Sequence, residues 1–427
     1  MMIDMSPQRA TALMTTSEAA AHLGVKPASL YSYVSRGLLA RTVGPDGRSS
    51  RFDAGEVDRL ARRGKPRRSS RDPSVEIVVQ SSITRIPSGP SQRHGHEYRG
   101  QQAFRLAERA TFEEVAGLLV TGELRALTVE PTRPRRGTTG PRDPLAAMRV
   151  RLDSLPSLDP SDLASPEESL EAAAGQVLGA VLGPPSPHLD TPALVLRTGR
   201  SVEGSVAARL AVELSEDGVP PTWVVEAINV LLIVMADHDL APATLAARLA
   251  ASTRAAPAAC VVAALATLSG PLHGGASELV RSALDRPDPL AFLVGAAGTG
   301  PVPGFGHFLY PGGDPRTTIV FDRVRRGAPE HPVTRAAERV GAQQSRRSGP
   351  PPNIDLAIAA LMGAGGLRPG AGAALFAVAR TAGWLAHIAE EFQAPPLRFR
   401  PRAIHTSPGA ESGDKLSDEP GNPGQPV

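Results

Sequence analysis

The sequence predicts an almost entirely α-helical protein, in which a long helical body follows a small N-terminal module. Three observations support this fold class. From about Glu76 onward, segments such as 201–217 and 220–239 repeat apolar residues at the three- and four-residue spacing of a helix. Capping residues, prolines and glycines mark where these segments begin and end. Stretches that alternate apolar and polar residues, which would indicate strands, are scarce.

Composition places the chain among globular proteins, with 41% hydrophobic and 21% charged residues. The single cysteine, Cys260, excludes an internal disulfide. The N-terminus has no basic region followed by a long apolar stretch, so we expect no secretory signal. The longest strongly apolar run, 228–236, is far shorter than the ~20 residues that span a bilayer. We therefore expect a cytoplasmic protein.

The first helix of the N-terminal module is predicted over the segment SEAAAHL. Either Thr15 or Thr16 can cap it, and Glu18 lies in its first turn, where a negative charge is favourable. Gly24 ends the helix. A second helix opens at Pro27, because proline is tolerated in the first turn.

The rest of the module is predicted as a hairpin and a third helix. In the second helix, Leu30, Tyr33 and Val34 recur at helical spacing. Pro-Asp-Gly at 45–47 is a strong turn signal for a hairpin, and Asp53 can cap the helix that follows. Two helices, a hairpin and a helix form the layout of a winged helix-turn-helix, which we assign to residues 1–63.

This stretch resembles the start of MerR-type and excisionase-type DNA-binding modules. Residues 1–75 hold 13 Lys and Arg against 7 Asp and Glu, whereas the whole chain has a net charge of only +3. The N-terminal region is therefore the one part of the chain that is basic enough to neutralise a polyanion. The alternative is a helical module that binds protein, its arginines merely solvated. By resemblance, the candidate DNA-contacting residues are Lys26, Ser29, Tyr31, Ser32 and Arg36 in the second helix and Arg48 and Arg51 in the wing.

Polar segments separate and end the predicted domains. Residues 64–75 are basic and broken by proline, which predicts a linker, and the body follows it. Residues 406–427 contain almost no large apolar side chain, which predicts a disordered tail. Early in the body, Thr111 precedes an apolar helix and Glu114 lies three residues on, as in a capping box.

Three of the ten histidines, His238, His273 and His307, lie at helix boundaries beside glycine or proline. One such histidine would more often be structural, but three together favour a cleft that they share. The other histidines lack this setting, and we expect them to be structural or exposed: His22, His94, His96, His188, His331, His387 and His405. His94 and His96 are two residues apart without an evident third ligand, so we expect no metal site.

Six segments resemble the citrate synthase family in order and spacing. They are ADHDLAPATLAAR, GPLHGGASE, PGFGHFLYPGGDPR, PPNIDLAIAAL, VARTAGWLAHIAEE and FRPRAIHTSPG, and the resemblance extends over about 76–405. It implies a two-domain helical fold with a large domain at 76–274, a small domain at 275–385 and a return to the large domain at 386–405. It also implies acyl-CoA and oxaloacetate as substrates, a homodimer and no cofactor.

The resemblance implies a role for each site residue. Removing an α-proton from a thioester requires a placed base and stabilisation of the enolate oxygen. The family's motifs place Asp355 as the base, His273 as the donor to the thioester oxygen and His307 as the group that polarises the ketone. His238, Arg316, Arg380 and Arg400 would bind the dicarboxylate, the last of them from the partner subunit.

The sequence departs from the family in two places. Phe308, Pro311, Gly312 and Gly313 lie where the family commonly carries the basic residues that help to hold CoA phosphates, and 356–361 is unusually apolar. Acetyl-CoA and propionyl-CoA remain alternatives, because one methylene changes preference by only ~1–3 kcal/mol. A second hypothesis is a DNA-binding regulator whose body senses oxaloacetate, citrate or an acyl-CoA. A third makes the N-terminal module a protein-interaction appendage.

Overall fold

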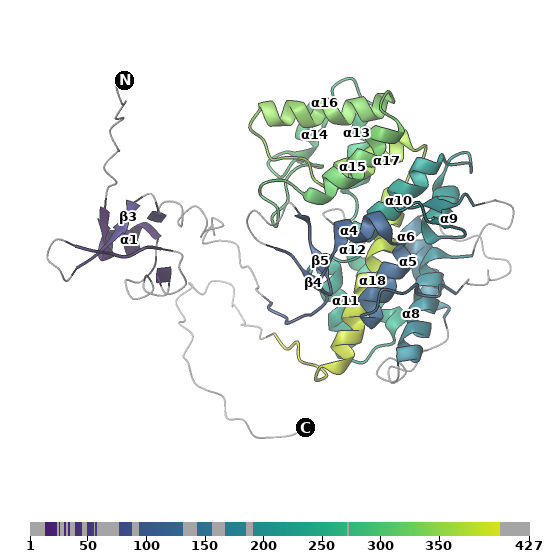
Figure 1. Cartoon of the computed structure of the whole chain (residues 1–427), viewed down its shortest axis with the longest axis horizontal. Helices are drawn as coiled ribbons and strands as arrows, with labels where there is room; N and C mark the ends of the chain where they lie inside the picture. The colour runs from purple at the N-terminus through teal and green to yellow at the C-terminus, as the bar shows by residue number, and fades with distance from the viewer. Residues whose placement is uncertain are drawn as a thin grey trace, which may run out of the picture. The chain divides into compact units, whose positions relative to one another are not determined.

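The computed structural model describes residues 13–23, 25, 30, 33–34, 39–44, 49–54, 56–57, 77–87, 94–130, 143–155, 167–184, 191–270 and 273–401. The chain divides into two compact units, Met1–Gln80 and Ser81–Val427, each described by itself below. Unit 2 carries the long helices of Figure 1. Within the described residues the longest strand has four residues, so the prediction of an almost entirely helical protein is confirmed.

Unit 1 combines one described helix with a small antiparallel sheet. Strands β1 (Leu13–Thr15), β2 (Thr42–Val43) and β3 (Ser50–Asp53) have the order β1-β3-β2, and α1 spans Thr16–Leu23. Its core is small and apolar, and it includes the predicted positions of the second helix. The core residues are Ala19, Ala20, Leu23, Leu30, Leu39, Phe52 and Val57, with Tyr33 and Val34 packed against them.

The caps predicted for this module are present. Thr15 Oγ1 accepts the N–H of Glu18 at 3.2 Å, while a Glu18 carboxylate oxygen accepts the N–H of Thr15 at 2.8 Å. Thr15 therefore caps α1 through a reciprocal capping box. Asp53 likewise accepts the N–H of Glu56 at 2.8 Å. The predicted hairpin pairs β2 with β3, and β1 is a third strand that sequence analysis did not predict, because three residues are too few to show an alternation.

Unit 2 is built from helices, with a few two-residue strands between them. Its helices are α4 (Ala103–Arg109), α5 (Phe112–Thr121), α6 (Pro144–Asp153), α8 (Glu167–Leu182), α9 (Val206–Leu214), α10 (Thr222–Met235), α11 (Pro242–Ser252), α12 (Pro257–Leu268), α13 (Ala276–Leu284), α14 (Pro289–Ala297), α15 (Pro315–Gly327), α16 (Pro332–Arg346), α17 (Ile354–Ala364) and α18 (Ala371–Gln393). Its strands are β4 (Thr84–Arg85), β5 (Glu97–Tyr98), β6 (Gln101–Gln102), β7 (Leu194–Val195) and β8 (Ser201–Val202).

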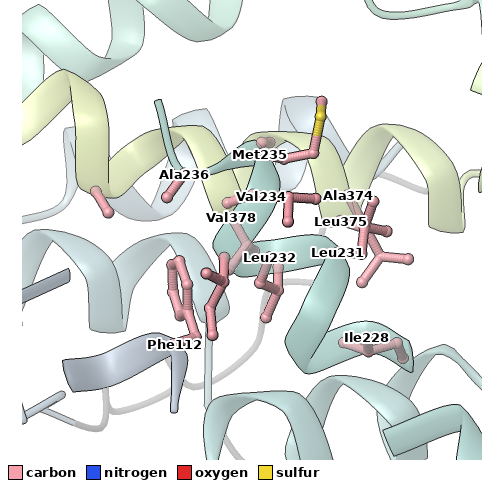
Figure 2. Close-up of a cluster of buried hydrophobic side chains, with 14 of the residues drawn as sticks. Phe112, Ile228, Leu231, Leu232, Val234, Met235, Ala236, Ala374, Leu375 and Val378 are labelled. Carbon is pink, nitrogen blue, oxygen red and sulfur yellow. The ribbon is translucent and has the colours of Figure 1, made fainter. Parts of the chain in front are cut away.

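Helices α10 and α18 form the centre of this unit. Figure 2 shows Leu231, Leu232 and Met235 of α10 beside Leu375 and Val378 of α18. Of the described helices, α18 alone is long and apolar enough to cross a membrane, but 89% of its most apolar window is buried inside the protein. It is therefore the central helix of a core, and its apolar length is explained by packing on all sides.

A capping box and a buried asparagine fix the start of α5 against α10. Thr111 Oγ1 accepts the N–H of Glu114 at 3.3 Å and Glu114 returns a bond to the N–H of Thr111 at 2.8 Å, which confirms the predicted capping box. The side chain of Asn229 on α10 accepts from Phe112 N–H and donates to Ala110 O, both at 3.0 Å. Because both the oxygen and the nitrogen of the Asn229 amide form hydrogen bonds, this buried side chain links the two helices without leaving a polar group unpaired.

Helices α13 to α17 form a second group, which Figure 1 shows together at the top of the view. Helix α17 packs on α13, α15 and α16, and α15 also packs on α10. Loops at the ends of α10, α12, α15 and α17 consequently meet between this group and the α10–α18 core. The histidines and carboxylates described below lie on those loops and helix ends.

Candidate active site

A cavity of about 690 Å³ lies among these loops and helix ends. Six stretches that are far apart in the chain contribute its lining: 235–242, 267–273, 307–309, 316, 353–355 and 376–380. Six of the seven substrate-site residues predicted from the sequence line it: His238, His273, His307, Arg316, Asp355 and Arg380. The seventh, Arg400, is exposed and is not part of the lining.

His238 follows α10 and is held by Tyr310. Its Nε2 lies 2.9 Å from the Tyr310 hydroxyl, and its ring meets the edge of His307 at 5.2 Å between centroids. Burial, followed by the positive charge of Arg316, holds the pKa of His238 well below its usual range. This imidazole is therefore neutral at physiological pH.

His307 is a hydrogen-bond donor toward the cavity. Its Nδ1 accepts the backbone N–H of Leu309 at 3.2 Å, so the neutral ring carries its proton on Nε2. Burial, followed by the positive charge of Arg316, lowers the pKa of His307 to about 4. The loop that places this ring turns at Gly304 and Gly306, whose φ angles of 85° and 75° are in the region that favours glycine.

His273 lies just after α12, with its Nε2 buried and without a partner among the described residues. Its ring meets the edge of Phe376 at 6.0 Å, and burial lowers its pKa. Packing requires the glycine that follows His273, because a Cβ on Gly274 would lie 2.5 Å from the Leu268 carbonyl oxygen.

Asp355 lies in the first turn of α17, whose N-cap is Asn353. The Asn353 side chain accepts the N–H of Asp355 at 3.0 Å and donates to Gly306 O at 2.9 Å, so it fixes the carboxylate relative to the His307 loop. Burial raises the pKa of Asp355 to about 6, although Arg316 opposes the shift. A carboxylate of this kind accepts a proton near neutral pH more readily than an exposed one.

The two arginines of the cavity are buried to a similar degree but are neutralised differently. Arg316 donates from Nε and Nη2 to both carboxylate oxygens of Asp314, at 2.9 and 2.8 Å. Arg380 forms no ion pair with a described residue, its Nε has no hydrogen-bond partner, and its Nη1 reaches His238 O only at 3.5 Å. The charge of Asp237 acts on Arg380 without forming an ion pair with it, so the buried guanidinium keeps free donors that suit an anionic ligand.

Several residues that sequence analysis left as structural or did not name support this site. His96, predicted to be structural or exposed, is fully buried, with its ring 5.8 Å from that of His238. Its Nε2 lies 2.8 Å from the Tyr98 hydroxyl, which donates to the carbonyl of Ile233 at 2.8 Å. Among these supporting residues only Asp314, which pairs with Arg316, had a local signal in the sequence: it lies two residues before Arg316 in the segment GGDPR.

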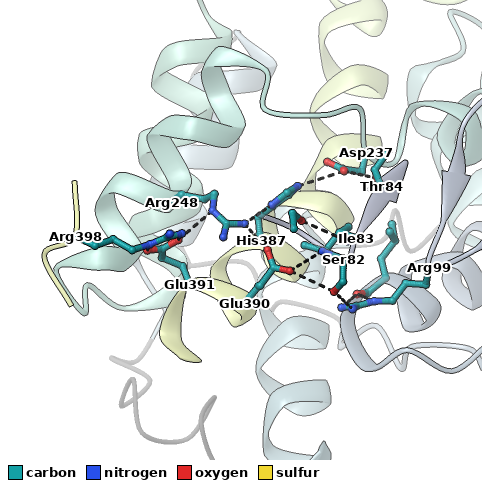
Figure 3. A network of polar contacts seen from close by, with 12 residues as sticks. Ser82, Ile83, Thr84, Arg99, Asp237, Arg248, His387, Glu390, Glu391 and Arg398 are labelled. Atoms are coloured by element: carbon teal, nitrogen blue, oxygen red, sulfur yellow. Dashed lines mark hydrogen bonds and ion pairs between the residues drawn. The ribbon is translucent and has the colours of Figure 1, made fainter. Parts of the chain in front are cut away.

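A polar network behind the cavity holds the residue next to His238 (Figure 3). Asp237 accepts from Thr84 Oγ1 at 2.5 Å and contacts His387 Nε2 at 3.3 Å. Arg248 Nη1 lies 2.6 Å from His387 Nδ1. An arginine cannot accept, so His387 Nδ1 accepts and its Nε2 donates to Asp237. Arg248 is in turn paired with Glu391 at 3.0 Å.

Most of the predicted DNA-contacting residues lie outside the described residues: Lys26, Ser29, Tyr31, Ser32, Arg36 and Arg48. Arg51 is described. It lies in β3, half-buried, with Thr15 and Thr42 opposite it on the two neighbouring strands. Its role in binding DNA stays a prediction.

Two family models match the chain. "Citrate synthase, C-terminal domain" matches residues 75–402 and "Helix-turn-helix domain" matches residues 13–65. Putative citrate synthase 2 of Mycobacterium tuberculosis is 33% identical over 209 residues, which are 47% of this chain and 56% of that protein. The chain thus spans about half the length of the first curated relatives that it matches. The 2-methylcitrate synthase of Shewanella oneidensis is 28% identical over 330 residues, covering 70% of this chain and 85% of the relative.

The fold is shared with solved structures. Citrate synthase from Thermoplasma acidophilum, solved as a ternary complex with carboxymethyl coenzyme A and oxaloacetate, has a TM-score of 0.61 and 22% identity. The match covers 80% of this chain and 96% of that one. At this identity the likeness shows the fold alone, and it agrees with the two-domain helical fold that the sequence motifs imply.

The geometry of His307 generates a direct prediction. Because its Nδ1 accepts a backbone N–H and burial lowers its pKa to about 4, its ring stays neutral and protonated on Nε2 down to that pH. Titration of the ring nitrogens by two-dimensional ¹⁵N–¹H NMR measures both the tautomer and the midpoint. A midpoint near 6.5, or a proton on Nδ1, would contradict this description.

Proposed function

The chain belongs to the citrate synthase family, and we propose that it condenses an acyl-CoA, acetyl-CoA or propionyl-CoA, with oxaloacetate to give citrate or 2-methylcitrate and CoA. The observation that carries this proposal is Arg380, a buried guanidinium without a carboxylate partner among the described residues. It lines one cavity together with two neutral histidines and a carboxylate of raised pKa. A dicarboxylate would supply the missing negative charge.

The residues of the cavity divide the chemistry among them. Asp355 removes a proton from the α-carbon of the thioester, while an N–H of His273 donates to the thioester oxygen as the enolate forms. The Nε2–H of His307 donates to the ketone oxygen, and the α-carbon attacks the ketone carbon, which forms the new carbon–carbon bond. Water then cleaves the thioester and releases the CoA thiol. The substrates supply every reacting atom except this water, so the proposal includes no cofactor.

His238 and the arginines hold the second substrate. Arg380 and Arg316 place positive charge at the wall of the cavity, and His238 is oriented by Tyr310. Because Asp314 already occupies two donors of Arg316, Arg380 supplies the larger share of free guanidinium donors. This arrangement suits a planar carboxylate, which accepts two parallel N–H bonds from one guanidinium.

We expect oxaloacetate-dependent release of thiol from acetyl-CoA or propionyl-CoA, and loss of this release in Asp355→Asn. Loss of a positioned base costs about 10²–10⁴-fold in rate. The wild-type rate should fall as the pH drops through about 6, because protonated Asp355 cannot accept the α-proton. A thiol-reactive chromophore measures the release, and the ratio of the two acyl-CoA rates identifies the preferred substrate.

Two further variants make this test specific. Asp285→Asn changes an exposed carboxylate at the end of α13 and should leave the rate unchanged. Arg380→Gln should raise the KM for oxaloacetate more than the KM for the acyl-CoA. If the wild-type chain releases no thiol from either thioester yet still binds oxaloacetate, the proposal of catalysis is wrong.

We also propose that the chain acts as a cytoplasmic homodimer, in which Arg400 completes the cavity of the partner subunit. Arg400 is exposed in the single chain and lies outside the lining of its own cavity. The expected result is that Arg400→Gln and Asp355→Asn are each inactive alone. Co-refolding equal amounts should restore about a quarter of the wild-type activity, because half of the dimers then hold one intact site. No recovery from demonstrably mixed dimers would contradict the shared site.

A second function, regulation of transcription by the same chain, is supported by the helix-turn-helix match over 13–65. We expect the full-length chain to bind duplex DNA at low salt and to lose affinity about tenfold or more when salt rises from about 50 to 200 mM. Gel-shift competition measures this loss. Asp355→Asn is the control, since it should bind DNA as the wild type does. Absence of binding even at low salt would leave the module as a protein-interaction appendage.

A further inference from the structure

A second cavity, of about 1160 Å³, lies along α15 and shares no lining residue with the active-site cavity. Helix α15 forms one wall and α16 another. Helix α4 and the turn between β7 and β8 also line the cavity. It is large enough for an organic ligand of ordinary metabolite size.

Arg323 is the unusual residue of this cavity. Its side chain is 9% exposed, yet it forms no hydrogen bond or ion pair with any residue of the part of the chain that the structure describes. Its neighbour on α15, Arg325, is paired with Asp322 at 3.0 Å, so this nearby carboxylate is already used. None of its guanidinium nitrogens is among the fully buried unpaired atoms, so the group is open to the cavity and its donors can meet a ligand there.

The surroundings of Arg323 increase the positive charge. Arg326 lies one turn further along α15 and Arg197 lies on the β7–β8 turn, and both line the same cavity. Burial lowers the pKa of Arg323, and the charges of Arg326 and Arg197 lower it further. Glu108 and Glu226 act in the opposite direction. Glu108 forms an ion pair with Arg197 at 3.6 Å, and Arg326 Nε donates to the carbonyl oxygen of Asp322 at 3.1 Å. Carboxylates of Asp322 and Glu338 also line the cavity, so Arg323 is, of these three arginines, the one that remains without a partner among the described residues.

The walls beside these arginines are apolar in part. The half-buried rings of Phe104 on α4 and Phe321 on α15 line the cavity, as does the half-buried side chain of Ile319. Three guanidinium groups beside aromatic faces suit a ligand that combines a multiply charged group with an apolar or planar part.

We propose that this cavity is a second ligand site, which binds a small phosphate-bearing molecule through Arg323, with Arg197 and Arg326 beside it. A phosphoryl group presents several oxygens to guanidinium groups from two directions, whereas one carboxylate engages a single guanidinium fork. The site is separate from the proposed condensation and does not depend on it. Its ligand touches α15, whose first turn carries Arg316 of the active site.

The test uses the full-length chain, with inorganic pyrophosphate as the probe and calorimetric titration as the measurement. We expect saturable binding of pyrophosphate, weakened at least tenfold in Arg323→Gln. Arg339→Gln is the matched control, because it removes an equal charge from an exposed position on α16 outside the cavity. A parallel titration with succinate distinguishes a phosphoryl ligand from a dicarboxylate. The part of the binding that is lost in Arg323→Gln should be weaker for succinate than for pyrophosphate.

A thermal unfolding measurement separates binding from a structural role. Pyrophosphate should raise the Tm of the wild type and of Arg339→Gln by mass action but leave that of Arg323→Gln unchanged. Without ligand, Arg323→Gln should be at least as stable as the wild type, since it removes an unpaired buried charge. The proposal is wrong if pyrophosphate does not bind, if binding survives unchanged in Arg323→Gln, or if succinate binds more tightly through Arg323. Binding by the basic N-terminal module would survive this substitution and so would be recognised.

Discussion

The burial of positive charge beside the end of α10 is the constraint on which the candidate site depends. Arg316 is stabilised by a two-bond contact with Asp314, and Arg380 is held between His238 and the ring of Phe376 without a carboxylate of its own. Such an arrangement costs stability and must be offset elsewhere. The nearly complete burial of α10 and α18 supplies this offset, because both helices are apolar over almost their whole length (Figure 2).

The same positive charge explains the protonation states around the cavity. Burial and the field of Arg316 both disfavour imidazolium, so His238 and His307 are neutral and can act as directed donors or acceptors. Asp355 is affected oppositely, because burial raises its pKa while Arg316 lowers it. The balance leaves the carboxylate ionised above about pH 6 but more basic than an exposed aspartate. Neutral donors beside a basic carboxylate are what proton transfer at carbon requires.

Local signals predicted the parts of the fold that depend on neighbours in sequence. The cap predicted at Thr15 or Thr16 and the capping box predicted at Thr111–Glu114 depend on residues a few positions apart, and both are present, the first at Thr15. The three glycine- and proline-flanked histidines do line one cavity. His387 could not be placed in this way, since its partners Arg248 and Asp237 are more than a hundred residues distant, and Asp237 in turn accepts from Thr84 (Figure 3). Only the folded chain brings such pairs together.

Arg400 shows a different limit, because the role proposed for it lies in a partner subunit and no contact within its own chain can test that role. The loop after His307 shows a third limit of prediction from sequence. Phe308 is 87% exposed and stacks on His307 at 5.2 Å, in a stretch where the family commonly carries positive charge. Gly312 and Gly313 of this stretch line the second cavity, but its arginines are not part of the active-site lining beside Phe308. An acyl-CoA bound as proposed would meet an apolar, aromatic surface at Phe308. Its affinity should depend less on salt than that of a ligand held by guanidinium groups.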